Sequence, residues 1–284
     1  METHVFQTKD GLMIEYSIRG AGRPILVFHG GHSNCREEFG YDELLRSGYS
    51  LLTPSRAGYG QTSAGIGKNL GTACQAYSEL LDHLGMDKID VIAVSAGGAS
   101  GIYWASHYPQ RVRSLTLQSA VSGRWHSPQD KTYKVAQLLF GASMEKYTWA
   151  AVRFMSNHFA RVMFKQMAPS FSILPYSEVL ARTREGDILA FCKMNNRQRS
   201  GHGFLLDLPQ INSITESDLN NIRCPTLIQH SPNDGAVPIE HARRAHQHIT
   251  GSRLHLLDTW GHLIWLGKGS EALHPELLEF LAQA

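Results

Sequence analysis

The chain has 284 residues, enough for one large α/β domain or two ordinary ones, and its 42% hydrophobic and 18% charged residues exclude intrinsic disorder. Its 27 basic and 25 acidic side chains leave a formal charge of only +2. A nucleic-acid binder concentrates Lys and Arg on one surface to neutralise phosphates, so we expect no nucleic-acid partner.

The first 121 residues alternate between strand and helix patterns. Alternating apolar residues over 5–8 and 12–18 flank Lys9-Asp10-Gly11, and an Asp-Gly pair between two such runs predicts an antiparallel hairpin. A continuous apolar run predicts a strand over 24–28, and 49–53 repeats that pattern. Further strands are predicted over 89–94 and 112–118. Helical spacing of apolar residues predicts helices over 70–84 and 96–108.

The strand signal vanishes over 122–221, where the sequence is rich in Met, Phe, Trp, Tyr and Arg at helical spacing. Strand patterns resume over 225–230 and 254–257, and an amphipathic helix follows. Alternating strands and helices are typical of a mostly parallel sheet with helices on both faces. We therefore predict a core formed by 1–121 and 222–284, with 122–221 inserted as a helical cap.

The chain shows no export or membrane signal. Its first ten residues lack the basic and apolar stretches of a signal peptide, and the uncharged run over 91–106 is shorter than the ~20 residues that span a bilayer. The cysteines are scattered without a close pair, which favours free thiols: Cys35, Cys74, Cys192 and Cys224. We expect a cytoplasmic protein without a membrane partner, and the sequence predicts no oligomeric state.

The strongest local motif surrounds Ser95. An apolar strand runs into Ser95-Ala96-Gly97-Gly98 and then into a predicted helix, the arrangement of a nucleophile elbow. The strained turn requires small residues two positions before and after the serine, and Ala93 and Gly97 meet that requirement. Ala93 replaces the first glycine of the G-x-S-x-G pattern, a change of one methyl group. The motif predicts Ser95 as a nucleophile, whereas a bystander serine in a glycine-rich turn is the simpler alternative.

A second motif, His29-Gly30-Gly31-His32, follows the buried strand over 24–28. Acyl transfer passes through a tetrahedral oxyanion that needs two prearranged N–H donors. We predict the backbone N–H groups of Gly31 and Ala96 as those donors, and His32 as a residue that contacts substrate. Glycines that merely end a strand are the alternative.

Two further residues follow the last predicted strands. Asp234 lies in Asn233-Asp234-Gly235 just after the strand over 225–230, and His262 lies in Gly261-His262 after the strand over 254–257. A turn aspartate often has only a structural use, and the chain has 15 histidines, so neither residue is diagnostic alone.

The order Ser95, Asp234, His262, each just after a strand, resembles the α/β-hydrolase superfamily over 1–121 and 222–284. The turn Arg56-Ala57-Gly58-Tyr59-Gly60 is similar to a structural signature of that family. The resemblance implies a serine hydrolase in which His262 takes the Ser95 proton and Asp234 orients the imidazole. It implies a small-molecule substrate and no metal or organic cofactor.

The cap is expected to form an apolar roof that selects the substrate. Phe154 and Phe159 are our candidates for substrate contacts, among a larger set of aromatic and Met residues: Trp125, Tyr133, Phe140, Tyr147, Trp149, Met155, Met163 and Phe164. Three arginines of the insertion could meet an acidic group of a substrate or remain solvated: Arg184, Arg197 and Arg199. Asp207 is interpreted as an anchor for the segment that returns to the core.

Several functions remain compatible with this sequence. A serine at the elbow excludes the branches that use aspartate there, while esterases, lactonases, C–C bond hydrolases and aminopeptidases share one triad. Cleavage of a small, largely apolar carboxylic ester is the least specialised hypothesis. A small-molecule receptor with slow turnover is the alternative from another class. A metal site at His241, His246 and His248 competes with a helix that has a polar face, and the helix is favoured.

Overall fold

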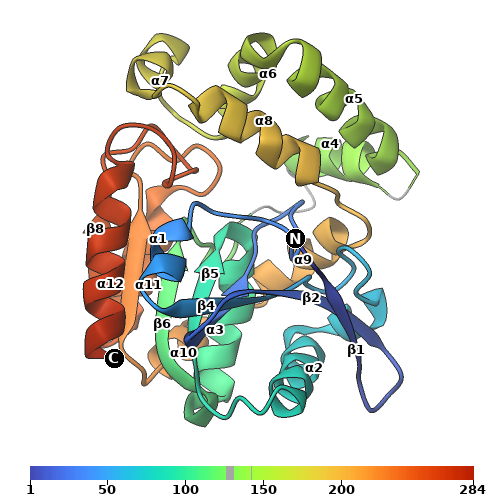
Figure 1. Ribbon diagram of the computed structural model, residues 1–284, viewed down its shortest axis with the longest axis vertical. Helices are drawn as coiled ribbons and strands as arrows, with labels where there is room; N and C mark the ends of the chain where they lie inside the picture. The colour runs from blue at the N-terminus through green and yellow to red at the C-terminus, as the bar shows by residue number, and fades with distance from the viewer. Residues whose placement is uncertain (126–130, 142) are drawn as a thin grey trace.

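Eight strands form one sheet in the computed structural model, which describes residues 1–125, 131–141 and 143–284 (Figure 1). Their order across the sheet is β1-β2-β4-β3-β5-β6-β7-β8. The antiparallel pairs are β1 with β2 and β2 with β4, and the other pairs are parallel. The strands are β1 (His4–Gln7), β2 (Met13–Gly20), β3 (Arg23–Phe28), β4 (Tyr49–Pro54), β5 (Ile89–Val94), β6 (Val112–Gln118), β7 (Thr226–His230) and β8 (Arg253–Leu256).

Helices cover both faces of this sheet (Figure 1). One face packs against α2 (Leu70–His83), α3 (Gly98–His107), α10 (Glu216–Asn220) and α11 (Ile239–His248). The other face packs against α1 (Asp42–Arg46) and α12 (Leu273–Gln283). Short 3-10 turns complete the core: η1 (Ala64–Lys68), η2 (Ser95–Gly97), η3 (Pro109–Arg111) and η5 (Ser270–Ala272).

The central strands β3, β4, β5 and β6 are buried along most of their length because helices cover both faces of the sheet. In β3, Leu26 and Phe28 point into the cluster with α2 and α3, whereas Ile25 and Val27 point into the cluster with α1 and α12. This alternation follows from the two-residue period of a strand. It explains why continuous apolar runs located these strands in the sequence.

The insertion between β6 and β7 is helical, and no strand occurs in its described part. Its first helices lie over the carboxyl ends of the central strands and are called the cap helices here: α4 (Lys131–Phe140), α5 (Glu145–His158), α6 (Ala160–Met167), α7 (Tyr176–Arg182) and α8 (Asp187–Arg197) (Figure 1). A 3-10 turn, η4 (Ala168–Ser170), follows α6. In contrast, α9 (Gly203–Asn212) contacts α3 and η1, and α10 contacts α3 and α11, so the end of the insertion packs on the core.

Most of the predicted elements are confirmed within one or two residues. The hairpin at Asp10-Gly11 joins β1 to β2, with Gly11 in the left-handed region at φ 77°. The helix predicted over 96–108 begins as η2 and continues as α3. The short helix α1 was not predicted, because five residues carry too little periodicity to be seen.

Two further expectations concern the cysteines and membrane spans. All four cysteines are free thiols, three of them buried, as predicted. Within the described ranges, every helix is too short or too polar to cross a membrane.

Close packing of α3 on β5 depends on Gly101. A Cβ atom added at Gly101 would lie 2.5 Å from Cβ of Ala93 and 3.4 Å from Cδ1 of Leu115. The small residue two positions before Ser95 and the glycine six positions after it are therefore one steric unit. A methyl group added at Gly101 would force α3 away from β5. The close approach of α3 to β5 therefore requires small residues at both Ala93 and Gly101.

We predict that Gly101→Ala destabilises the protein and that Ala93→Gly in the same chain offsets the loss. Overpacking of this kind costs about 1–3 kcal/mol, although alanine also favours the helix. Urea unfolding of the wild type, both single variants and the double variant gives the coupling free energy between the two positions. The helix propensity that alanine adds at position 101 drops out of this coupling. A coupling near zero would contradict the steric unit; we expect at least about 1 kcal/mol.

Candidate active site

Ser95 occupies a strained turn between β5 and α3. Its φ is 52°, in the left-handed region that residues with a side chain rarely adopt. A Cβ at Gly97 would overlap the carbonyl oxygen of Phe28 and lie 2.7 Å from that of His29, so only glycine fits there. The turn is held because β3 and its following loop press directly against it, and it presents Ser95 at the carboxyl edge of the sheet.

A chain of hydrogen bonds joins Ser95 to His262 and Asp234. The Oγ atom of Ser95 lies 2.9 Å from Nε2 of His262, and Nδ1 of His262 lies 2.7 Å from Oδ2 of Asp234. Both His262 and Asp234 are buried. Three residues separated by 139 and 28 positions of sequence thus meet because each follows a parallel strand whose carboxyl end reaches the same edge.

The Asp234 carboxylate is fixed on both oxygens. Its Oδ1 accepts hydrogen bonds of 2.8 Å from the backbone N–H groups of Ala236 and Val237, which leaves Oδ2 for His262. His230 lies behind it, with Nε2 3.4 Å from Oδ2 and 2.9 Å from the Val237 carbonyl oxygen. Burial lowers the pKa of His230, so this second imidazole stays neutral beside the triad.

The loop after β3 lies directly beside Ser95. A Cβ at Gly30 would be 3.2 Å from Cβ of Ser95, and a Cβ at Gly31 would be 3.8 Å from Cβ of Ala96. In the described residues, neither the N–H of Gly31 nor that of Ala96 donates a hydrogen bond. Ala96 stands in the first turn of η2, where N–H groups have no partner within the helix.

Arg56 and His29 fix the direction of the Gly31 N–H group. The Gly30 carbonyl oxygen accepts from Nη2 of Arg56 at 3.2 Å and lies 2.8 Å from Nδ1 of His29. Because a trans peptide points its C=O and N–H in opposite directions, this anchoring turns the Gly31 N–H away from Arg56. Nε2 of His29 accepts the Arg56 backbone N–H at 2.9 Å, which assigns the Nδ1–H tautomer.

A buried ion pair supports Arg56. Its guanidinium binds both carboxylate oxygens of Asp207 on α9, and the Tyr59 hydroxyl donates to Asp207 at 2.6 Å. Burial opposes the charge of Arg56, yet the Asp207 carboxylate raises the pKa of Arg56 above its ordinary value. Asp207, interpreted from the sequence as an anchor, thus connects the insertion to the loop that carries Gly31.

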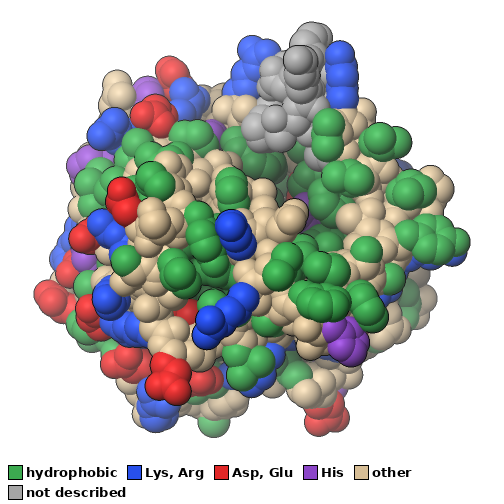
Figure 2. Space-filling model, turned by 90° about the horizontal axis from the view of Figure 1, so that it is seen from above, with side chains coloured by type: hydrophobic (Ala, Val, Ile, Leu, Met, Phe, Trp, Pro, Cys, Tyr) green, Lys and Arg blue, Asp and Glu red, His purple; other side chains and the backbone are tan. Residues whose placement is uncertain are grey.

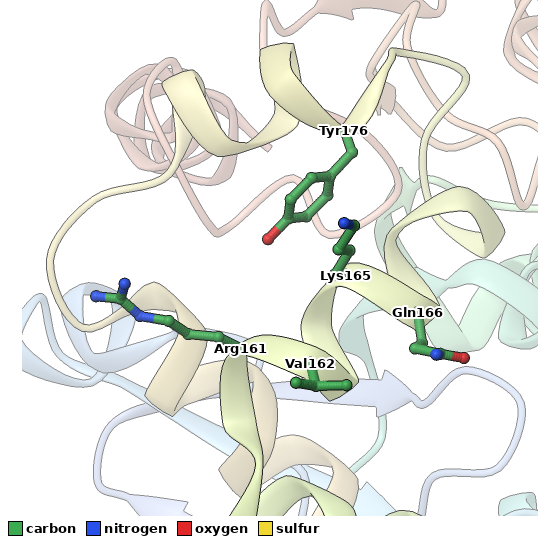
Figure 3. A pocket seen from close by; sticks show the side chains of 5 residues that line it. All are labelled: Arg161, Val162, Lys165, Gln166 and Tyr176. Carbon is green, nitrogen blue, oxygen red and sulfur yellow. The ribbon is translucent and has the colours of Figure 1, made fainter.

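The cavity over Ser95 is small, about 50 Å³. Its lining combines Ser95 and His262 with apolar walls and three polar side chains: Gly30, Gly31, Ser33, Glu37, Phe39, Val94, Phe171, Met194, Gln198, Leu263 and Trp265. Glu37 is paired with Arg197, whose Nη2 lies 2.7 Å from its Oε1. A larger hollow of about 540 Å³ lies elsewhere, on the cap helices, and contains no triad residue (Figure 3).

The predicted substrate contacts of Phe154 and Phe159 are not supported. Phe154 is 57% exposed on α5, Phe159 is 50% exposed at the end of α5, and neither lines the cavity over Ser95. Both are aromatic residues of a segment with helical spacing, which is why they were candidates. The buried side of these helices is instead filled by Trp149 and Phe164. Phe154 and Phe159 therefore remain on the outside of the cap.

His32 also lies outside the cavity lining. Its ring packs among Phe140, Trp149 and Phe204 at centroid distances of 4.2, 5.3 and 4.1 Å, and its Nδ1 is 2.8 Å from the Ser200 hydroxyl. Its side chain connects the loop after β3 to the cap. Desolvation by these rings lowers the pKa of His32 to about 3.

The three arginines considered for substrate binding all have carboxylate partners. Arg184 pairs with Glu271, Arg197 with Glu37, and Arg199 with Glu145. The remaining cap aromatics include buried Trp149 and Phe164, while Tyr147 is exposed, and the side chain of Tyr133 lies outside the described residues.

The helix predicted in place of a metal site is confirmed as α11. Its histidines have separate partners: Nδ1 of His241 accepts the Ser122 N–H at 3.1 Å, and Nδ1 of His246 lies 3.0 Å from the Ser252 hydroxyl. His248 lies 3.8 Å from Glu216. The three side chains do not converge on one point.

One contribution of the insertion was missed in the sequence. The carbonyl oxygen of Phe171 accepts the N–H of His262 at 2.8 Å and that of Gly235 at 3.2 Å, and the N–H of Ile173 donates to Asn233 at 3.0 Å. A segment between η4 and α7 thereby joins the loops that carry Asp234 and His262. Irregular backbone of this kind leaves no periodic pattern by which it could have been found.

The low pKa of His32 predicts acid sensitivity. The unfolded chain protonates this imidazole near ~6.5, whereas the folded protein keeps it neutral to about 3, so the unfolded state binds more protons in between and stability falls as pH falls. Between about pH 4 and 6, His32→Phe should flatten the slope of unfolding free energy by up to about 1.4 kcal/mol per pH unit. Urea unfolding at several pH values measures this. His4→Phe, at an exposed position, is the control; equal slopes in wild type and His32→Phe would contradict the assignment.

Comparison with known proteins identifies the family. A family model for the α/β hydrolase fold matches residues 23–268. The chain is 53% identical over 274 residues to the uncharacterized hydrolase YcgS of Bacillus subtilis, with 96% of each chain covered. It is 27% identical over 253 residues to 2-hydroxy-6-oxo-2,4-heptadienoate hydrolase of Pseudomonas putida, covering 86% of this chain and 84% of that one.

A solved structure, an α/β hydrolase fold protein from Nakamurella multipartita, superposes with a TM-score of 0.84 at 26% identity and covers 99% of both chains. These similarities confirm the predicted fold and the prediction of an enzyme. With its mostly parallel sheet, its helices on both faces and its match over most of its length, the chain belongs to the α/β-hydrolase fold family and is a hydrolase.

Proposed function

We propose that this hydrolase cleaves a small, largely apolar carboxylic ester through an acyl-enzyme on Ser95. The observation that carries the proposal is the hydrogen-bond chain from Ser95 through His262 to Asp234. A serine hydroxyl is a poor nucleophile until a neighbouring base removes its proton, and Nε2 of His262 is within reach to do so.

The proposed reaction has two stages. In the first, Oγ of Ser95 attacks the substrate carbonyl carbon while its proton passes to His262, and the imidazolium then protonates the departing alcohol. In the second, His262 takes a proton from water, the resulting hydroxide attacks the acyl carbon, and Ser95 leaves with the proton returned by His262. Asp234 stabilises the imidazolium in both stages, and the N–H groups of Gly31 and Ala96 donate to the oxyanion.

The cavity supports a short acyl group. Its volume is only about 50 Å³. Much of its lining is apolar, including Phe39, Phe171, Met194, Leu263 and Trp265. Glu37 and Gln198 add polar groups to the lining, so one polar substituent on the substrate would find a partner. C–C bond cleavage, an alternative that the sequence leaves open, is the second reaction to be tested. The relative from Pseudomonas putida, named a 2-hydroxy-6-oxo-2,4-heptadienoate hydrolase, suggests a dienoate as the test substrate.

A substrate panel tests the proposal. We expect 4-nitrophenyl acetate and butyrate to be hydrolysed with kcat/KM at least about tenfold above the octanoate, because the longer chain exceeds the cavity. Ser95→Ala should lower kcat by about 10³-fold or more, as removal of a nucleophile does. Steady-state rates with both proteins on every substrate measure this, and a fluorophosphonate should label Ser95 alone.

Each other outcome has a defined meaning. Wild-type rates in Ser95→Ala would refute the nucleophile. A 2-hydroxy-6-oxo dienoate cleaved with a higher kcat/KM than any ester would replace ester hydrolysis by C–C bond cleavage on the same triad. Labelling of Ser95 without turnover of any panel member would favour the slow-turnover receptor instead.

The Phe171 carbonyl supports a part for the insertion in positioning the triad. A Cβ at Gly261 would overlap that oxygen and lie 3.1 Å from Cβ of Ser172, so Gly261→Ala should push the 171–173 segment away from His262. Because a displacement of about 1 Å can cost 10²-fold, we predict a 10- to 100-fold lower kcat for the preferred ester with a smaller change in KM. Gly65→Ala, which meets only the flexible tip of Leu12 at 3.3 Å, is the control, and unchanged kcat in folded Gly261→Ala would contradict this role.

A further inference from the structure

The outer surface of α5 and α6 carries large apolar side chains in the open. Tyr147, Phe154, Phe159 and Val162 are between 48% and 60% exposed. Tyr147, Phe154 and His158 are spaced seven and four positions apart, which places them in one stripe along α5. The opposite sides of α5 and α6 face α8 and hold buried Trp149 and Phe164, so the stripe points away from the rest of the molecule.

The aromatic rings of this stripe contact one another. Phe154 lies 4.6 Å from the His158 ring and 6.4 Å from the Phe159 ring, measured between centroids. Three exposed basic residues lie on the same two helices: Lys146 on α5, and Arg161 and Lys165 on α6. We call these three residues together with Tyr147, Phe154, Phe159 and Val162 the outer cap face.

The charge of this region has one sign. Residues 146–177 contain Lys146, Arg153, Arg161 and Lys165 but no Asp or Glu. Among the described residues, no carboxylate forms an ion pair with any of the four, whereas the arginines further along the cap, such as Arg197 and Arg199, are paired. The outer cap face therefore holds positive charges that the protein itself does not neutralise.

Figure 3 shows the open hollow at one end of this face. It is lined by Arg161, Val162, Lys165 and Gln166 of α6 and by Tyr176 of α7. Nζ of Lys165 stands 5.7 Å from the centre of the Tyr176 ring, and Nζ of Lys146 stands 4.9 Å from that of Tyr147. An ammonium group therefore lies beside an aromatic ring at each of these two places. Figure 2, which views the molecule from above, shows both hydrophobic and basic side chains on that side of the surface.

We propose that the outer cap face docks the enzyme on an anionic lipid surface. Aromatic rings with interspersed Lys and Arg, on a helical face without acidic residues, suit the boundary between lipid headgroups and acyl chains. Anionic headgroups supply the countercharges that the protein lacks here. From the sequence we expect no membrane partner, because no segment is long and apolar enough to span a bilayer. Docking at a lipid surface needs no such segment, so it departs from that expectation.

The charge of the outer cap face favours an anionic lipid surface over a second copy of the chain as its partner. A symmetric dimer brings the same patch of both subunits together, so the patch with Lys146, Arg161 and Lys165 would face an equally basic patch on the partner. Like charges brought together across an interface are unfavourable. An anionic surface instead satisfies the charged and the apolar side chains at the same time.

Co-sedimentation with vesicles tests the proposal. The full chain should bind vesicles that mix phosphatidylcholine with phosphatidylglycerol, and salt should weaken the binding. Each basic side chain contributes about fivefold, so a triple variant, Lys146→Gln, Arg161→Gln and Lys165→Gln, should bind about a hundredfold more weakly. A second variant, Phe154→Ser with Phe159→Ser, should lose at least about tenfold.

A matched control removes three exposed positive charges that lie outside the insertion, on the surface of the α/β core domain. Lys9→Gln, Lys68→Gln and Arg223→Gln change the net charge equally and should bind within about twofold of the wild type. Thermal unfolding confirms that each variant is folded. Absence of vesicle binding, or equal losses in the control and the cap variants, would overturn the proposal, as would a dimer in solution that Phe154→Ser with Phe159→Ser dissociates.

Discussion

The backbone of Ser95 is the constraint on which the site depends. A φ of 52° is unfavourable for a serine, and it persists only because its surroundings permit no other path. Gly97 lets the loop after β3 press on the turn, while Ala93 and Gly101 let α3 approach β5. The same contacts that force the strain also bring the Gly30-Gly31 loop beside the serine. The positions of the proposed nucleophile and of its proposed oxyanion donors thus follow from one packing arrangement.

Buried polar groups connect the loops around Ser95, Asp234 and His262 to the insertion. The Arg56–Asp207 pair is buried, and a buried pair stabilises little by itself because both charges lose water. The pair also makes four further hydrogen bonds, to groups of His29, Gly30 and Tyr59, and these hold the loop after β3 in one orientation relative to α9. Phe171 does the same for the loops of Asp234 and His262. Both connections begin in the insertion, so residues of the insertion help to hold the loops that carry Gly31, Asp234 and His262.

The sequence was informative where regular structure or chain order dictates position. The strand patterns located β5, β7 and β8 within one residue, so the sequence predicts that Ser95, Asp234 and His262 follow strand ends. Loop-borne residues such as Phe39, Gln198 and Trp265 follow no period, which is why the lining of the cavity was not predicted. Phe154 and Phe159 were assigned wrongly for a different reason. An apolar residue in a cap helix can face the core or the solvent, and spacing alone does not say which side is outward.

In the proposed reaction, Ser95 attacks a carbonyl whose oxygen is held by the backbone N–H groups of Gly31 and Ala96. A crystal structure of the protein after reaction with a small alkyl phosphonate measures this most directly, because the adduct resembles the tetrahedral intermediate. We expect the phosphorus on Oγ of Ser95 and one phosphonyl oxygen within 2.7–3.1 Å of both backbone nitrogens. An adduct on another residue, or an oxygen turned away from Gly31 and Ala96 and toward solvent, would contradict the account.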